Sequence, residues 1–235
     1  MAKMVGLSRT VKLQWLNKVV ELVLEGLSEK EIKDQLNEYL SFEIESPTNI
    51  RKTREILMNI WVFENEQSGK IKSSALDLIK AYPEYDFVIH WCMLMAAYPV
   101  FVDMCKLIGK MSEFQDEITL VQLKQKLFDE WGERTTLFHS IDKLVATLKA
   151  LDVVESEKPG KYRVKTHKVG NSKVVAFMVF TMMIVDDSGY YSFTDINSSI
   201  YLFPFEYRME KEALLEDGRF AMNNFGGELS ISLID

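Results

Sequence analysis

Apolar residues recur at intervals of three and four through most of this chain, which is the period of helices that bury one face. The first such run ends at Gly26, and Ser28 then opens a second helix, with Glu31 three residues later completing a capping box. A third helix is predicted to begin at Ser46-Pro47-Thr48, because proline is favoured in a first helical turn. These helices resemble a helix-turn-helix, but the predicted connector, residues 36–46, is longer than the tight turn of such motifs and favours an ordinary three-helix packing unit. Three basic residues on the third helix form a candidate phosphate-contacting patch: Arg51, Lys52 and Arg54.

The middle of the chain is its most hydrophobic part. Residues 64–72 are polar and predict a linker or turn. Residues 86–109 are apolar on all sides, which predicts a buried central helix that Pro99 should kink or divide. Cys92 and Cys105 fall within this segment without a CxxC spacing, which is typical of core thiols in a reducing compartment.

The next segment predicts two helices followed by a basic hairpin. Thr119 caps the first helix, Gln122 completes its capping box, and Trp131-Gly132 ends it. The second helix is predicted over residues 135–151, and two short strands then surround Pro159-Gly160. This order is typical of a winged helix, in which one helix enters the DNA major groove and the hairpin lies on the backbone. Winged helices also serve as protein–protein modules, and the pattern leaves that alternative open.

The candidate DNA contacts follow from this arrangement. Polar side chains near the start of the second helix would lie near base edges: Thr135, Thr136 and His139. Basic side chains of the helix and hairpin would contact phosphates: Lys143, Lys149, Lys161, Arg163 and Lys165. The net charge of −7 opposes a simple nucleic-acid binder. Because acids concentrate near the C-terminus, the sequence still allows a locally basic face, or a charged face that only keeps the domain soluble.

The C-terminal segment has a different pattern. Residues 174–185 are an apolar run that is too short to span a bilayer, and they predict a buried helix or strand. Short apolar runs separated by turn residues follow and predict a β-rich appendage. Phe203, Phe205 and Phe225 are expected in its core, or as exposed anchors if the protein is an adaptor. The expected fold is mainly α with a smaller β component, as a helical bundle in four units: residues 1–66, 67–112, 113–170 and 171–235.

Catalytic or metal-binding residues are not clustered in the sequence. His90 lies two residues from Cys92, on a nearly opposite helix face, and is expected in the core; the other histidines are His139 and His167. No glycine-rich phosphate loop or nucleophile elbow is present, and Asp186-Asp187 is explained by a turn. We therefore expect no enzymatic activity, no cofactor and no metal. A hydrophobic content of 47%, and no recognisable signal peptide, predict a soluble cytoplasmic protein.

Three stretches taken in order carry a family resemblance. They are the helix pair and basic helix within residues 15–61, the apolar helix around His90-Trp91-Cys92, and the winged-helix-like residues 119–154. Together they resemble the BrxA-type proteins of bacterial BREX phage-exclusion systems, over about two-thirds of the chain. The resemblance implies a small helical accessory protein that binds double-stranded DNA and joins other proteins of a defence complex. Because no apolar run is long enough to span a bilayer, we expect no membrane contact. The segment from Asn171 onward and the acidic charge depart from it.

Overall fold

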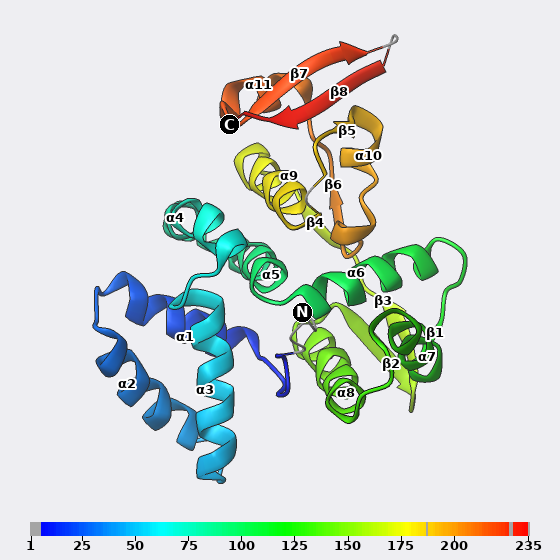
Figure 1. Cartoon of the computed structure of the whole chain (residues 1–235). Helices are drawn as coiled ribbons and strands as arrows, with labels where there is room; N and C mark the ends of the chain where they lie inside the picture. Colours follow the sequence, from blue (N-terminus) through cyan, green and yellow to red (C-terminus); the bar gives the residue numbers. More distant parts are fainter. Residues whose placement is uncertain (1–5, 187, 226–227, 235) are drawn as a thin grey trace.

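The structure, a computed structural model, describes residues 6–186, 188–225 and 228–234 and is mainly helical (Figure 1). Helices hold 64% of the residues and strands 13%, which confirms the expected fold class. The helices surround two central apolar ones, and three small sheets lie at the periphery. The strands are short, and β3, for example, alternates exposed with half-buried positions, as expected at the surface.

Three helices form the N-terminal unit: α1 (Leu13–Leu24), α2 (Glu29–Ser41) and α3 (Pro47–Trp61). The capping box of Ser28 and Glu31 opens α2 as predicted. The predicted long connector is wrong, because α2 continues through Ser41 and only residues 42–46 separate it from α3. Leu36 and Leu40 are fully buried and carry the apolar stripe of α2 to its end. The α2–α3 junction is therefore tighter than the sequence indicated, and closer to a helix-turn-helix.

The predicted linker at residues 64–72 is also wrong, because most of it belongs to α4 (Glu66–Ala81). The Asn65 side chain accepts a hydrogen bond from the Ser68 backbone N–H, and Ser68 Oγ accepts one from the Asn65 N–H. Ile71 is fully buried one turn later. The capping box and the burial of Ile71 stabilise the helix in spite of its polar first turn and Gly69.

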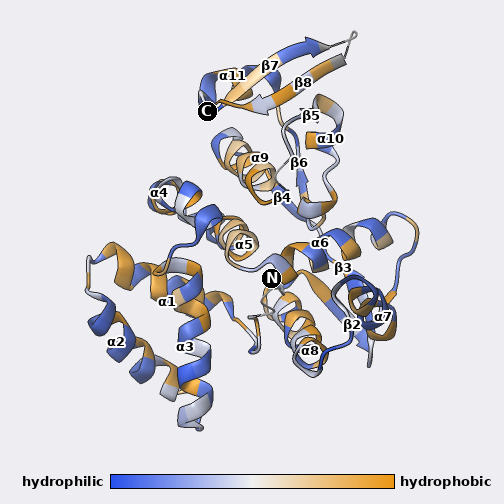
Figure 2. Ribbon diagram, viewed as in Figure 1, coloured by the Kyte–Doolittle hydropathy of each residue, from blue (hydrophilic) through white to orange (hydrophobic). Residues whose placement is uncertain are grey.

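The central helices are α5 (Asp86–Ala97), preceded by the 3₁₀ turn η1 (Pro83–Tyr85), and α6 (Pro99–Ser112). The two arms, Pro83–Ala97 and Pro99–Ser112, are bent by 116°, which confirms the predicted break at Pro99. The apolar run at residues 174–185 is a helix, α9 (Ser172–Asp186), which packs on α5. Figure 2 shows α5 and α9 coloured mainly as hydrophobic at the centre of the molecule.

Among the described residues, no single helix combines the length and the hydrophobicity needed to cross a bilayer. Taken together, the bent pair Pro83–Ala97 and Pro99–Ser112 is long and hydrophobic enough, by length and composition only. Nine consecutive residues of α5, from Val88 to Ala96, are buried inside the protein.

The winged-helix unit follows α6. Its elements are β1 (Ile118–Thr119), α7 (Leu120–Trp131), α8 (Thr135–Ala150), β2 (Val154–Lys158) and β3 (Lys161–Val164). The sheet has the antiparallel order β1-β3-β2, with Ile118 opposite Tyr162 and Val154 opposite Val164. Thr119 and Gln122 form the predicted capping box, and Gly132 ends α7 with a φ of 77°. The two helices and the two-stranded hairpin occur in the order that the sequence predicted, whereas the strand β1 was not predicted.

The C-terminal segment is mixed α and β, whereas the sequence predicted a β-rich appendage. Its helical elements after α9 are α10 (Phe193–Asn197), η2 (Ile200–Leu202) and α11 (Lys211–Asp217). The parallel pair β4 (His167–Val169) and β6 (Phe205–Tyr207) joins it to the winged helix. A second sheet has the order β5-β8-β7, from β5 (Tyr191–Ser192), β8 (Glu228–Leu233) and β7 (Phe220–Phe225). The sequence did not predict these helices, because they are too short to show a helical period. The capping box of Ser192 and Asp195, for example, starts a helix of only five residues.

Candidate nucleic-acid interface

The outward face of α8 carries the predicted base-edge residues. Thr136, His139 and Lys143 are all exposed, and their spacing of three and four residues places them on one side of the helix. Thr135 is exposed at the first position of α8. The opposite side is held in the core by fully buried residues: Leu137, Ile141, Leu144 and Leu148. The structure therefore brings Thr135, Thr136, His139 and Lys143 together on a surface that solvent can reach.

Two lysines of α8 keep their charge available. Lys143 and Lys149 are exposed, and neither makes an ion pair among the described residues. Lys149 lies in the last turn of α8, where its positive charge interacts favourably with the helix dipole. These two side chains give the helix a positive charge that no neighbouring carboxylate compensates.

An exposed aromatic side chain on α8 was missed by the sequence analysis. Phe138 is 44% exposed, stacks on Phe128 with ring centroids 6.2 Å apart, and lies under Lys124 Nζ at 3.8 Å from its ring centroid. Lys124 also pairs with Asp142 at 2.7 Å. The exposure of Phe138 could have been predicted, because this residue falls outside the apolar period of its helix.

The basic residues of the wing are compensated by carboxylates. Glu117 accepts from Lys161 Nζ at 3.2 Å and from Arg163 Nη2 at 3.1 Å, and Arg163 Nη1 also donates to Glu157 at 2.9 Å. Lys165 Nζ donates to both carboxylate oxygens of Asp152, at 2.6 and 2.7 Å. The hydrogen bond from Lys161 is the largest cause that lowers the pKa of Glu117 below its ordinary value. The hydrogen bond to Asp152 raises the pKa of Lys165. The wing is therefore much less positive than its basic residues alone suggest.

The predicted patch on α3 is divided by the structure. Arg51 and Lys52 are exposed near the start of the helix. Arg54 is half-buried, and its guanidinium donates to Glu55 Oε1 and, over 2.9 Å, to Asn37 Oδ1. Arg54 therefore serves the packing of α2 against α3, and the accessible patch consists of Arg51 and Lys52.

The N-terminal segment, residues 6–12, connects α3 with α8 and was not predicted to have a role. Arg9 Nη2 donates to Asn49 Oδ1 over 3.0 Å, and the Val11 N–H donates to Thr147 Oγ1 over 3.0 Å. The second bond joins residues 136 positions apart, so no local pattern could have indicated it.

His90 and both cysteines are buried in the core. His90 is fully buried; the Trp61 indole N–H donates to its Nδ1 over 3.0 Å, so its Nε2 proton is directed to Asn17 Oδ1 at 2.6 Å. Burial lowers the pKa of His90 to about 3 and raises the pKa of Cys92 to about 12. His167 contacts the Asp152 carbonyl oxygen through Nε2 at 2.9 Å. Within the described part of the chain, no three His, Cys, Asp or Glu residues form a group that could hold a metal ion.

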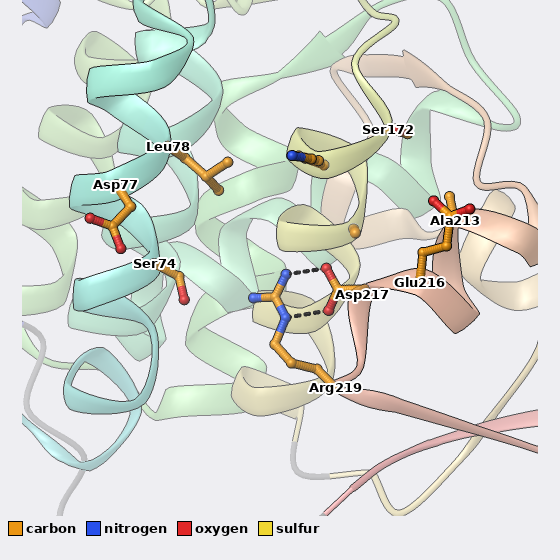
Figure 3. A pocket seen from close by; sticks show the side chains of 10 residues that line it. Ser74, Asp77, Leu78, Ser172, Ala213, Glu216, Asp217 and Arg219 are labelled. Carbon is orange, nitrogen blue, oxygen red and sulfur yellow. Dashed lines mark hydrogen bonds and ion pairs between the residues drawn. The ribbon is translucent and has the colours of Figure 1, made fainter.

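A cleft of about 410 Å³ lies between α4, α9 and α11 (Figure 3). It is lined by Arg219, whose guanidinium makes two hydrogen bonds to Asp217 and lies 4.5 Å from the centroid of the Phe180 ring. Its remaining charged lining residues are Asp77, Lys173 and Glu216. The charges are of both signs, and the described lining contains no histidine or cysteine. This cleft offers no paired nucleophile and base.

Phe203 and Phe205, two of the three aromatic residues considered as anchors, are not exposed. Phe205 is 6% exposed and contacts Trp91, with ring centroids 5.6 Å apart. Phe203 is half-buried against the same indole at 5.7 Å. Both are core residues, as the sequence pattern favoured, so the anchor role considered for them in an adaptor is wrong. The side chain of Phe225 lies outside the described part of the structure.

Comparison with protein-family models, with curated proteins and with solved structures finds no match to this chain.

Proposed function

We propose that this protein is a non-enzymatic, cytoplasmic protein that binds double-stranded DNA. The observation that carries the proposal is the outward face of α8 in a winged-helix arrangement. That face presents Thr136, His139 and Lys143 to solvent, and Lys143 makes no ion pair with a carboxylate among the described residues. Small polar side chains and histidine suit contacts with base edges, while lysine suits phosphates.

The acidic net charge limits how such a protein binds. Most of the positive charge on the wing is bound by Glu117, Glu157 and Asp152, so few residues remain to neutralise phosphates. We therefore expect modest affinity that depends on a small number of cations and is sensitive to salt. The resemblance to BrxA-type proteins supports a role as an accessory component of a bacterial phage-defence system, with other proteins of that system as partners.

A pair of multiple variants tests the proposal. Lys143→Ala/Lys149→Ala should weaken binding to labelled duplex DNA and flatten the dependence of log affinity on log salt by about 2, since each lost phosphate contact contributes about 0.9. Lys161→Ala/Arg163→Ala/Lys165→Ala should flatten it by less than the roughly 2.7 that three free contacts would contribute. If the first variant binds DNA with the wild-type affinity and slope, α8 does not contact DNA.

A protein-interaction adaptor is the second candidate function, and one observation favours it. Phe114 is 83% exposed and lines a groove of about 640 Å³ between α6 and α7, together with Leu107 and Met111. Large exposed aromatic side chains are typical of protein-binding surfaces. Phe114→Ser separates the two functions, because it should leave DNA affinity unchanged and abolish capture of a protein partner if the adaptor function is correct.

A further inference from the structure

The N-terminal arm, residues 6–12, lies between α3 and α8 (Figure 1). Leu7 and Val11 are fully buried, so the arm is packed into the protein on two sides of Arg9. Gly6 begins the arm with a φ of 65°, and a Cβ at this position would lie 2.9 Å from the Tyr98 ring. The course of the arm is therefore fixed by packing at its start and along its length.

On one side the arm is joined to α8. The Val11 N–H donates to Thr147 Oγ1 over 3.0 Å, and that hydroxyl donates to the Lys143 carbonyl oxygen over 2.8 Å. Thr147 is fully buried and lies one turn after Lys143 on the same side of α8. The arm therefore docks beside the face of α8 that carries Lys143.

On its other side the arm is joined to α3. Arg9 Nη2 donates to Asn49 Oδ1 over 3.0 Å, and Arg9 Nη1 donates to the Ser8 carbonyl oxygen over 2.6 Å. Asn49 is three residues before Lys52, so both lie on one side of α3. Arg9 is half-buried and makes no ion pair among the described residues. These two bonds use two of the five N–H donors of a guanidinium and leave the others for an anion.

The two contact surfaces therefore adjoin each other. Arg9 and Val11 are two residues apart, so their backbones are separated by about 7 Å at most. We propose that α3, the arm and α8 form one continuous surface that binds a single stretch of double-stranded DNA, with Arg9 contacting a phosphate at the junction. This inference rests on the proposed function and adds a residue and a surface that the sequence did not indicate.

The chemistry of the junction fits a phosphate. An arginine fork that is already oriented by two hydrogen bonds loses little conformational entropy when it binds an anion, and it matches the geometry of phosphate oxygens. The outer residues of the surface, Lys52 and Lys143, are lysines that suit phosphates as point charges. The wing is not required for this surface.

Arg9→Ala in the full chain tests the proposal, with Lys30→Ala as the matched control. Lys30 is exposed on α2 and makes no ion pair among the described residues, so its loss changes the net charge equally. Binding to a labelled duplex of about two helical turns (about 10 base pairs each) is measured by fluorescence anisotropy over a range of salt concentrations. Arg9→Ala should weaken binding several-fold and flatten the salt slope by about 1, whereas Lys30→Ala should change neither and Arg9→Lys should restore the slope.

Two further variants test whether one duplex contacts both helices. Arg51→Ala/Lys52→Ala and Lys143→Ala/Lys149→Ala should each flatten the salt slope of the same one-to-one complex by about 2, and their combination by about 4. If only the α8 variant changes the slope, and Arg9→Ala behaves like Lys30→Ala, the continuous surface is wrong while the proposed DNA binding stands. If the wild-type protein does not bind the duplex at low salt, both proposals fail.

Discussion

The Val11 backbone N–H and the Thr147 hydroxyl are joined by a buried hydrogen bond of 3.0 Å that connects the N-terminal arm to α8 within the proposed DNA surface. Val11 opens the N-terminal helical unit, and Thr147 belongs to the exposed helix of the winged-helix unit. Because the bond lies in the core between them, it fixes the orientation of one unit relative to the other. Removing the acceptor and leaving a buried donor unsatisfied lowers the free energy of unfolding by more than the net contribution of the hydrogen bond.

Thr147→Val removes this acceptor with little change in side-chain volume. We expect the free energy of unfolding to fall by about 1–3 kcal/mol, because the Val11 N–H remains buried without its partner. Urea denaturation followed by tryptophan fluorescence measures the change. Thr147→Ser keeps the hydroxyl and should lose less. Equal stability of the Val variant and the wild type would mean that the bond is not made in solution.

His90 makes the stability of the fold depend on pH. Its pKa is lowered by burial to about 3 from the ordinary 6.5, so below pH 6.5 the unfolded chain takes up a proton that the folded chain does not. The contribution of His90 to the free energy of unfolding is therefore fully present above pH 6.5 and is lost on acidification. Between pH 7.5 and 5 this loss amounts to about 2 kcal/mol. Denaturant titrations at both pH values measure this loss.

The control for this effect is a pair of histidine variants. His90→Gln should reduce the difference between pH 7.5 and 5, while the exposed His139→Gln should keep it. A His90→Gln protein that loses as much stability as the wild type over this range would contradict the assignment.

Glu117 competes with DNA for the wing. Because its carboxylate accepts from both Lys161 and Arg163, Glu117→Gln should free Lys161 and leave Arg163 paired with Glu157 alone. DNA affinity should therefore rise, with a steeper salt dependence. Glu130→Gln on α7 is the matched control, since Glu130 is exposed, has the same charge and makes no ion pair among the described residues. Fluorescence anisotropy compares the two. An equal rise in DNA affinity in both variants would mean that the change in net charge, and not the release of the wing cations, causes the effect.

Two glycines in helices should respond to alanine with opposite signs. A Cβ on Gly109 in α6 would lie 2.2 Å from the Ile200 carbonyl oxygen, so Gly109→Ala must push α6 and η2 apart and should destabilise the fold by about 1–3 kcal/mol. Gly69 in α4 has no atom closer than 3.6 Å to such a Cβ, so Gly69→Ala should stabilise it by about 0.5–1 kcal/mol through helix propensity. Thermal or urea unfolding of both variants checks the pair. A stable Gly109→Ala protein would show that the contact with Ile200 is looser than described.

Capping boxes and long apolar periods explain how much of the fold could be predicted from the sequence. Thr119 with Gln122 located α7, and Pro99 located the break between the central helices. The start of α4 was missed because its capping box uses Asn65 and Ser68, and the Ser68 side chain replaces the usual Glu or Gln.

The candidate site was less accessible to sequence reasoning than the fold. The exposure of Thr136, His139 and Lys143 followed from helical periodicity. The pairing of Glu117 with Lys161 and Arg163 did not, because it joins residues 44 and 46 positions apart through the β1–β3 register. A list of basic residues therefore overestimated the charge of the wing. The contact between the arm and α8 depends on the tertiary fold alone.

Fluorescence anisotropy of the purified wild-type protein with labelled duplex DNA tests the central claim most directly. The titration is made at about 50 mM and again at about 200 mM salt, a range over which phosphate contacts lose affinity. We expect binding at low salt that weakens by about 10²- to 10³-fold at the higher concentration, because salt weakens roughly four or five phosphate contacts. An absence of binding at low salt would contradict the proposed DNA binding, and a protein partner would then be the next ligand to test.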